Sequence, residues 1–138
     1  MSASVADLEA RNTAVVRRYL RIFETGDVDE LPAVVAHDVN IHGASSRVTG
    51  RAHVESSLIT PGLSLFRVHI EDLFAAGHRV VVAFTLTYRH DASGRDVVMS
   101  GIKSYRLSEG LIVEFWGETD LYGLLRQLGH VPDQLPAF

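Results

Sequence analysis

The sequence contains no cysteine, which excludes disulfide bonds, thiol nucleophiles and cysteine-ligated metal sites. Its seven histidines show neither His-x-His nor His-Glu-x-x-His spacing, so we expect no metal site. There is also no Gly-x-Gly-x-x-Gly motif and no Walker loop, and nothing therefore indicates a nucleotide cofactor. The protein is expected to work without a cofactor.

There is also no excess of basic residues, because the net charge is -4 at pH 7 and the pI is near 5.9. Nucleic-acid binders usually carry a basic face, so we expect no nucleic-acid partner. No apolar run approaches the roughly 20 residues of a membrane helix. The N-terminus lacks the basic and apolar regions of a secretory signal. These features predict a soluble cytoplasmic protein with no membrane partner.

What is present is a globular composition, with 46% hydrophobic and 22% charged residues over 138 positions, enough for one domain spanning 1–138. Apolar residues recur at helical spacing from Asp7 to Thr25, and Gly26 is placed to end that helix. Asp27 can cap a short second helix that includes Val35, with Glu30 completing a capping box. We then expect a strand at 39–42, a loop at 43–50 and a helix at 51–58.

The second half of the sequence is rich in β-branched and aromatic residues that alternate with polar ones. Strands are expected at 66–74, 80–90, 96–107 and 111–118, with Phe66, Val68 and Ile70 on one face of the first. Asp120 can cap a closing helix that ends before Gly129, and 130–138 is expected to be a C-terminal tail. The pattern predicts an α+β fold in which a curved, mixed or antiparallel sheet wraps around the N-terminal helices. The concave face of such a sheet is the expected ligand pocket.

Several segments resemble a known family. VVRRY (15–19), FETGD (23–27) and AHDV (36–39) resemble the opening of the nuclear-transport-factor-2-like superfamily, whose domain is a cone-shaped α+β barrel. RLSEGLIVEFW (106–116) and DLYGLLRQLG (120–129) resemble its SnoaL-like polyketide cyclase branch. The first helix is also similar to that of ketosteroid isomerases. Because this fold hosts many chemistries, the resemblance is informative for fold and much less so for reaction.

The resemblance implies which side chains face the pocket. Tyr19 would point in from the first helix, and Gly101 and Lys103 from the third long strand. The residues expected to bind the substrate come from the first helix, the long strands and the end of the last strand: Phe23, Phe84, Leu86, Tyr88, Tyr105, Phe115, Gly117, Glu118 and Asp120.

The catalytic residues of the relatives do not transfer intact. Anthracycline-type SnoaL cyclases and limonene-type epoxide hydrolases carry an Asp where this sequence has Gly117, and Lys103 stands where the cyclases have His. Ketosteroid isomerases share Tyr19, but their base falls on Gly43 and their second Asp on Lys103. None of the three acid/base sets is therefore complete in this chain.

The residues themselves suggest another site. Tyr19 and Lys103 could together polarise a ligand oxygen, and burial would bring the lysine pKa toward neutrality. Lys103 would then serve as general acid, general base or imine-forming amine, unless it reaches solvent. His90 could move a proton, or it could simply begin the turn at Asp91.

Glu118 and Asp120 form a carboxylate pair at the end of the last strand. Asp120 is explained by helix capping, and strand alternation turns Glu118 away from the pocket if Gly117 points in. A bulge would reverse that orientation of Glu118.

Three functions remain open from the sequence. The first is a cofactor-free enzyme, an isomerase or lyase that cyclises or isomerises a polyketide-type biosynthetic intermediate with Tyr19, Lys103 and His90. The second is a binding or accessory protein that has lost the catalytic Asp. The third is an epoxide-opening hydrolase or cyclase. A homodimer through the outer face of the sheet is what the family implies, with Ile102, Ser104 and Trp116 at the interface.

Overall fold

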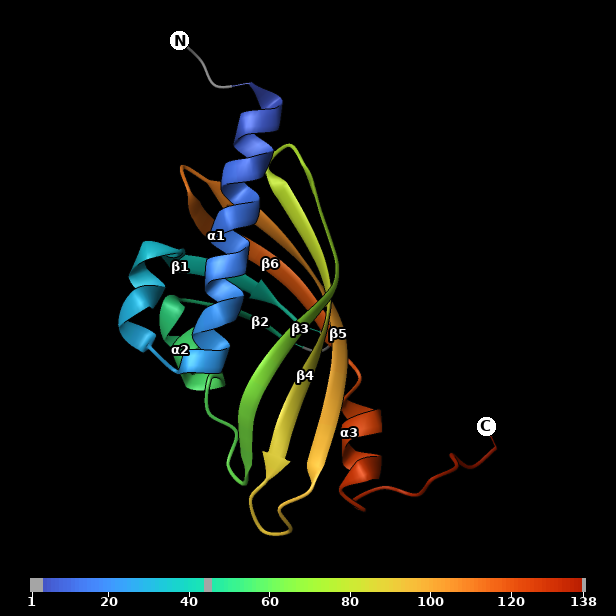
Figure 1. The fold of residues 1–138 in the computed structure, drawn as a ribbon. Coiled ribbons are helices and arrows are strands. Elements are labelled where there is room, and N and C mark those ends of the chain that lie inside the picture. The colour runs from blue at the N-terminus through green and yellow to red at the C-terminus, as the bar shows by residue number, and fades with distance from the viewer. Residues whose placement is uncertain (1–3, 44–45, 138) are drawn as a thin grey trace.

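The computed structural model describes residues 4–43 and 46–137 as a mixed α+β fold with one long helix lying across a curved, open sheet (Figure 1). The helical elements are α1 (Val5–Thr25), the 3-10 helix η1 (Val28–Ala33), α2 (Arg51–Ser57) and α3 (Leu121–Gln127). The strands are β1 (Val35–His42), β2 (Arg47–Thr49), β3 (Leu63–Ala76), β4 (Arg79–His90), β5 (Asp96–Ser108) and β6 (Leu111–Thr119). Their order across the sheet is β2-β1-β6-β5-β4-β3. The α+β class and the curved sheet over N-terminal helices are confirmed.

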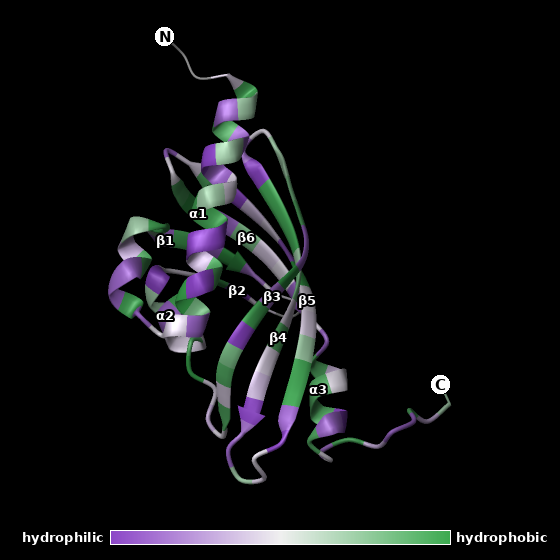
Figure 2. Ribbon diagram, viewed as in Figure 1, coloured by the Kyte–Doolittle hydropathy of each residue, from purple (hydrophilic) through white to green (hydrophobic). Residues whose placement is uncertain are grey.

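The helix α1 follows from its amphipathic pattern. Val16, Tyr19 and Ile22 lie on its buried side, and exposed arginines occupy the other. The side chain of Ser4 accepts the Asp7 N–H at the start, and Gly26 ends the helix at φ 70°, a conformation that glycine adopts without strain. The hydropathy colouring shows this alternation along the helix (Figure 2).

The segment after α1 differs from the prediction in three ways. The expected second helix is a 3-10 helix, and Asp27 accepts from the N–H of Asp29, while Glu30 bonds Arg18 at 3.1 Å instead of completing a capping box. Val35 belongs to β1, which starts four residues earlier than predicted. The expected loop at 43–50 contains the short strand β2. In the last two cases pairing with a neighbouring strand, β6 for Val35 and β1 for β2, outweighs local sequence preference.

The four long strands form an antiparallel array, and β1 joins it parallel to β6. The expected placement of Phe66 beside Val68 and Ile70 is wrong. The β3–β4 register shifts between Leu65 and Arg67, so Phe66 is 40% exposed while Val68 faces the core. A bulge of this kind changes which face a side chain takes, and simple alternation misses it.

The core lies between α1, η1 and the concave face of the sheet, where the side chains of β4, β5 and β6 meet those of α1. Val80, Val82 and Tyr105 are fully buried there, together with Tyr19 of α1. Within the described residues, no helix is both long and apolar enough to cross a membrane. The cytoplasmic location stays a prediction.

Candidate functional site

A cavity of about 190 Å³ opens on the concave face of the sheet, beside Lys103. Its walls are mostly apolar and come from α1, the end of α2 and the segment after it, and strands β3 to β6. The residues lining it are Phe23, Ser57, Leu58, Thr60, Leu65, Phe84, Leu86, Tyr88, Met99, Lys103 and Thr119. A smaller extension of about 20 Å³ reaches Leu20, Val68 and Tyr105. A mostly apolar hollow with one charged group is the usual make-up of a small-molecule site.

Lys103 supplies the only formal charge among the residues lining this cavity. Its ammonium nitrogen lies 5.3 Å from the ring centre of Phe115 and 5.9 Å from those of Phe23 and Phe84. In the described part of the chain, Lys103 takes part in none of the ion pairs. Three aromatic faces stabilise a cation only in part, since each contributes about 0.5–2 kcal/mol.

Burial lowers the pKa of Lys103 to about 8, because desolvation disfavours the charged form and no carboxylate offsets it. The side chain is partly buried and keeps its remaining exposure toward the cavity it lines. Lys103 is therefore mostly protonated at pH 7, with an appreciable neutral fraction.

Gly117 explains how the lysine fits. It is the cross-strand partner of Lys103, and a Cβ at position 117 would lie 2.9 Å from Cε and 3.0 Å from Cγ of that side chain. The lysine stem thus occupies the space that a side chain at 117 would need. A larger residue at position 117 would therefore require the lysine stem to move.

Tyr19 and Tyr105 pack behind the cavity with ring centres 5.5 Å apart. Tyr19 also packs edge-on against Phe23, at 5.2 Å, and it is not among the residues lining the cavity. Burial raises the pKa of both phenols, and Tyr19 adds to the rise at Tyr105. Both therefore stay neutral hydroxyls at ordinary pH and can act as donors.

The hydroxyl of Tyr105 is buried and has no hydrogen-bond partner within the described residues. Such a group costs about 1–3 kcal/mol, and its presence at a cavity calls for an explanation. Tyr105 lines the small extension together with Lys103, so both groups border the same space. Tyr19 and Lys103, the pair expected from the sequence, are linked through the rings of Phe23 and Phe115.

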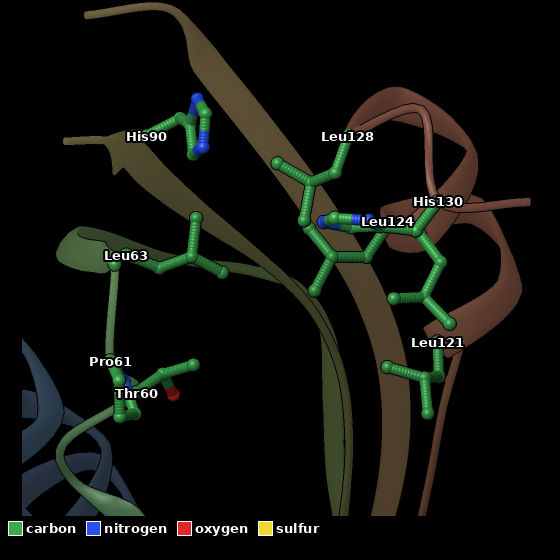
Figure 3. Close-up of a pocket in the computed structure, with 10 residues that line it drawn as sticks. Thr60, Pro61, Leu63, His90, Leu121, Leu124, Leu128 and His130 are labelled. Atoms are coloured by element: carbon green, nitrogen blue, oxygen red, sulfur yellow. The ribbon is translucent and has the colours of Figure 1, made fainter. Parts of the chain in front are cut away.

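His90 lies at a second hollow of about 290 Å³, between the end of β4 and α3 (Figure 3). Its Nδ1 atom is 2.7 Å from the hydroxyl of Ser93 in the following turn. Leucine side chains of α3 and His130 of the C-terminal segment line the opposite side. His90 does not line the Lys103 cavity, but Thr60 lines both hollows.

The two carboxylates lie outside both hollows. Glu118 is exposed and pairs with Ile102 on the outer face of the sheet, as strand alternation predicts. Asp120 accepts the Gly123 N–H at 2.9 Å and so caps α3. Capping accounts for Asp120, and the described structure gives neither residue a contact with the cavity.

Of the expected substrate-binding residues, Phe23, Phe84, Leu86 and Tyr88 line the cavity directly. Phe115 contacts the Lys103 ammonium, and Gly117 supports its stem.

The sequence reasoning missed six lining residues: Ser57, Leu58, Thr60, Leu65, Met99 and Thr119. Strand alternation predicts two of them. Met99 lies two residues from Gly101 on β5, and Thr119 lies two residues from Gly117 on β6, so each points to the same face as that glycine. It also missed that Lys103 is the only lysine among 13 basic residues, the rest being arginine. No group of three or more metal-binding side chains occurs in the described part of the chain.

Comparisons with known proteins agree with this fold. A SnoaL-like domain model matches residues 16–115. No protein of the curated set matches the sequence. Among solved structures, AclR of Streptomyces galilaeus, a proposed hydroxylase, superimposes with a TM-score of 0.77 at 20% identity, covering 91% of this chain and 89% of that one.

Two further structures are similar. IdmH of Streptomyces antibioticus, a proposed polyketide cyclase, gives a TM-score of 0.73 at 19% identity, with 86% of this chain and 98% of that one covered. An M. tuberculosis LEH-like epoxide hydrolase gives 0.72 at 18% identity, covering 87% and 90%. Identities this low establish the fold and leave the chemistry to the residues of the site.

Proposed function

Because the chain belongs to the SnoaL-like family, we propose that it is a cofactor-free enzyme that performs acid/base chemistry on a hydrophobic, oxygenated small molecule. Cyclisation or isomerisation of a polyketide-type intermediate is the reaction we favour. The observation that carries this proposal is the unpaired Lys103 ammonium at the wall of an otherwise apolar cavity.

The ammonium would stabilise negative charge that develops on a ligand oxygen, such as an enolate. An electrostatic donor fixed in a water-poor site is worth more than the same group in water. Lys103 is fixed by its packing over Gly117, and with its pKa near 8 it could also release a proton to the oxygen. The Tyr105 hydroxyl is a neutral donor on a residue that lines the same space, and Tyr19 packs against Tyr105.

His90 would act at the other end of the substrate. The hollow that it lines shares Thr60 with the Lys103 cavity, so a ligand extending past Thr60 would contact both ends. We propose that Lys103 polarises the oxygen while His90 accepts or returns a proton. Holding a flexible chain between these two points would itself favour ring closure.

The two alternatives make different demands. Opening an epoxide with water normally needs a carboxylate to activate the water, and no carboxylate is among the residues lining either hollow. A binding protein needs only the apolar walls, which are present. Measured turnover therefore distinguishes the acid/base enzyme from the binding protein.

We also propose that the protein is a homodimer formed through the outer face of the sheet. The proposal is supported by the exposed side chains of Ile102 and Trp116, which are 59% and 40% exposed on that face, with Ser104 between them.

The proposed chemistry can be tested with 1-tetralone, an aromatic ketone with exchangeable protons next to its carbonyl. Proton NMR in deuterated buffer at pH 7 would follow loss of those protons with and without the protein. We expect the wild-type protein to accelerate exchange, and Lys103→Met to lose about 10²–10³-fold of that acceleration. Arg17→Met, which removes an exposed charge from α1, is the matched control and should behave as wild type.

If wild-type protein binds 1-tetralone saturably but leaves its exchange at the buffer rate, the acid/base proposal fails and a ligand-binding function replaces it. Equal rates for wild type and Lys103→Met would remove Lys103 from the mechanism.

A further inference from the structure

We propose that Lys103 is also a nucleophile, which forms an imine with the carbonyl carbon of an aldehyde or ketone ligand. This inference rests on the proposed function because it uses the same cavity. It goes beyond that function by assigning a covalent step and a substrate class, a carbonyl compound with an apolar body.

The first support is the distribution of amines in the chain. Of the 13 lysine and arginine residues, Lys103 is the only lysine. Arginine stays protonated in proteins and cannot serve as an amine nucleophile, so the chain has a single side chain able to form an imine. That side chain lines the cavity, whereas Arg17 and Arg21 of α1 and most other arginines face solvent.

The second support is the surroundings of the amine. The groups packed against it are the three aromatic rings, and no acidic side chain is among the residues lining the cavity. The titratable groups that line the cavity and its extension with Lys103 are Tyr88 on β4 and Tyr105 on β5, and Tyr19 of α1 packs against Tyr105. Burial raises the pKa of all three, so none presents a negative charge that would hold the amine protonated.

These surroundings make the neutral amine accessible. With its pKa at about 8, roughly a tenth of Lys103 is neutral at pH 7, whereas an ordinary lysine is neutral in only about one molecule in a few thousand. Desolvated lysines of this kind are the ones that form imines in enzymes. The stem lying over Gly117 also fixes where the nitrogen meets a ligand.

The step balances without a further reactant. The lone pair of the neutral nitrogen attacks the carbonyl carbon, a C–N bond forms, and the carbonyl oxygen takes up a proton. The oxygen then takes up a second proton and leaves as water as the C–O bond breaks, and the nitrogen, having given up both of its protons, becomes that of the neutral imine. One amine and one carbonyl yield one imine and one water, with no change of oxidation state. The hydroxyls of Thr60 and Thr119 line the same cavity and can pass the protons.

The test is reductive trapping with 2-naphthaldehyde and sodium cyanoborohydride at pH 7, which converts an imine into a stable secondary amine. Peptide mass spectrometry would locate the naphthylmethyl group. The matched control is the double variant Lys103→Met/Arg17→Lys, which moves the single side-chain amine to the exposed face of α1. The N-terminal α-amine is present in both proteins and serves as an internal reference.

We expect trapping at Lys103 to be at least about tenfold faster than at position 17 of the control, given the difference in neutral fraction. Equal rates at the two positions, or no adduct at Lys103, would overturn the imine.

Lys103→Arg separates this inference from the proposed function, because it keeps the positive charge and cannot form an imine. Loss of 1-tetralone exchange in Lys103→Arg, together with a wild-type adduct, supports the covalent step. Retained exchange within about tenfold of wild type, without a wild-type adduct, rejects the imine and leaves the electrostatic role of Lys103 standing.

Discussion

The unpaired ammonium of Lys103 opposes folding. Moving a cation from water into apolar surroundings is costly unless a counter-charge accompanies it, and the three aromatic rings offset only part of that cost. A residue kept against stability in this way is typical of functional sites, where shifted pKa values gather.

The cost of Lys103 has a defined dependence on pH. Its folded pKa of about 8 lies below its unfolded value, so between pH 8 and about 10.4 the unfolded chain binds more protons than the folded one. Stability from this group therefore rises as the pH rises through that window. The penalty is fully present below pH 8.

We predict that Lys103→Met is more stable than the wild-type protein at pH 7, and that its advantage falls by about 1–2 kcal/mol between pH 7 and pH 10. The full pKa difference would give about 3 kcal/mol, but the partial exposure of Lys103 to the cavity reduces it. Urea denaturation of both proteins at the two pH values measures this. A pH-independent difference would mean that Lys103 is not desolvated.

Lys103 shows how much of the site could be predicted from the sequence. Its inward direction followed from strand parity and the family resemblance, and the structure places it at the cavity. That the lysine stem lies across Gly117 could not be predicted, because it depends on how a flexible side chain packs against its cross-strand neighbour. The separation of His90 from Lys103 was also unpredictable, since it depends on the curvature of β4 and on where α3 lies.

At the scale of elements, α3 closes the hollow beside His90 and covers the end of β5 that extends beyond β6. Its Gln127 donates to the carbonyl of Val98 at 2.8 Å and accepts the N–H of Val98 at 2.9 Å, at a point where β5 extends beyond β6. A short helix of this kind depends on its cap and its packing more than on its own propensity. Asp120 provides that cap.

We predict that Asp120→Ala lowers the free energy of unfolding by about 1 kcal/mol, because the Gly123 N–H loses its acceptor. Asp120→Asn keeps an acceptor oxygen and should remain within about 0.5 kcal/mol of wild type. Both variants can be compared by urea denaturation and 1-tetralone exchange. A large loss of exchange in Asp120→Asn at unchanged stability would show that Asp120 acts in catalysis and not only as a cap.

The elements themselves were predictable where periodicity is strong, as in α1 and the β4–β6 strands. The predictions are wrong where pairing with a neighbouring strand determines the secondary structure or the face that a side chain takes. Val35 was assigned to a helix, but it begins a strand because β6 offers it a parallel partner. Simple alternation puts Phe66 on the face of Val68 and Ile70, but a register shift turns it to the exposed side.

At the scale of the whole molecule, the sheet separates two surfaces with different roles. The concave face carries the core and the cavity. The outer face carries exposed apolar side chains in neighbouring strands, since Phe74 is aligned through Val81 and Ser104 with Trp116. Phe74 is 55% exposed and Trp116 40% exposed.

We call this row of side chains, Phe74, Val81, Ser104 and Trp116, the outer band, and neighbouring side chains hold its tryptophan in position. The ring of Trp116 stacks on His42 at 4.4 Å, and the Arg79 guanidinium lies 5.0 Å from its centre. His42 in turn bonds Glu114 at 2.8 Å, and that hydrogen bond, with a second from Arg106, lowers the pKa of the Glu114 carboxyl. The indole is therefore held in place, and a preorganised apolar surface is suited to docking a partner.

We predict that the protein is a dimer in sedimentation-velocity measurements and that Ile102→Glu shifts it to monomer. Ile102 is 59% exposed on the outer face, two residues from Ser104 on β5, and its cross-strand neighbour Glu118 is already negative. A second carboxylate there would face its own copy across a two-fold interface, and like charges brought together in that way cost several kcal/mol. Ile59→Glu is the control, because Ile59 is 78% exposed in the segment after α2, away from the band. A wild-type monomer would reject the dimer, and a dimer that survives Ile102→Glu would place the contact between subunits elsewhere.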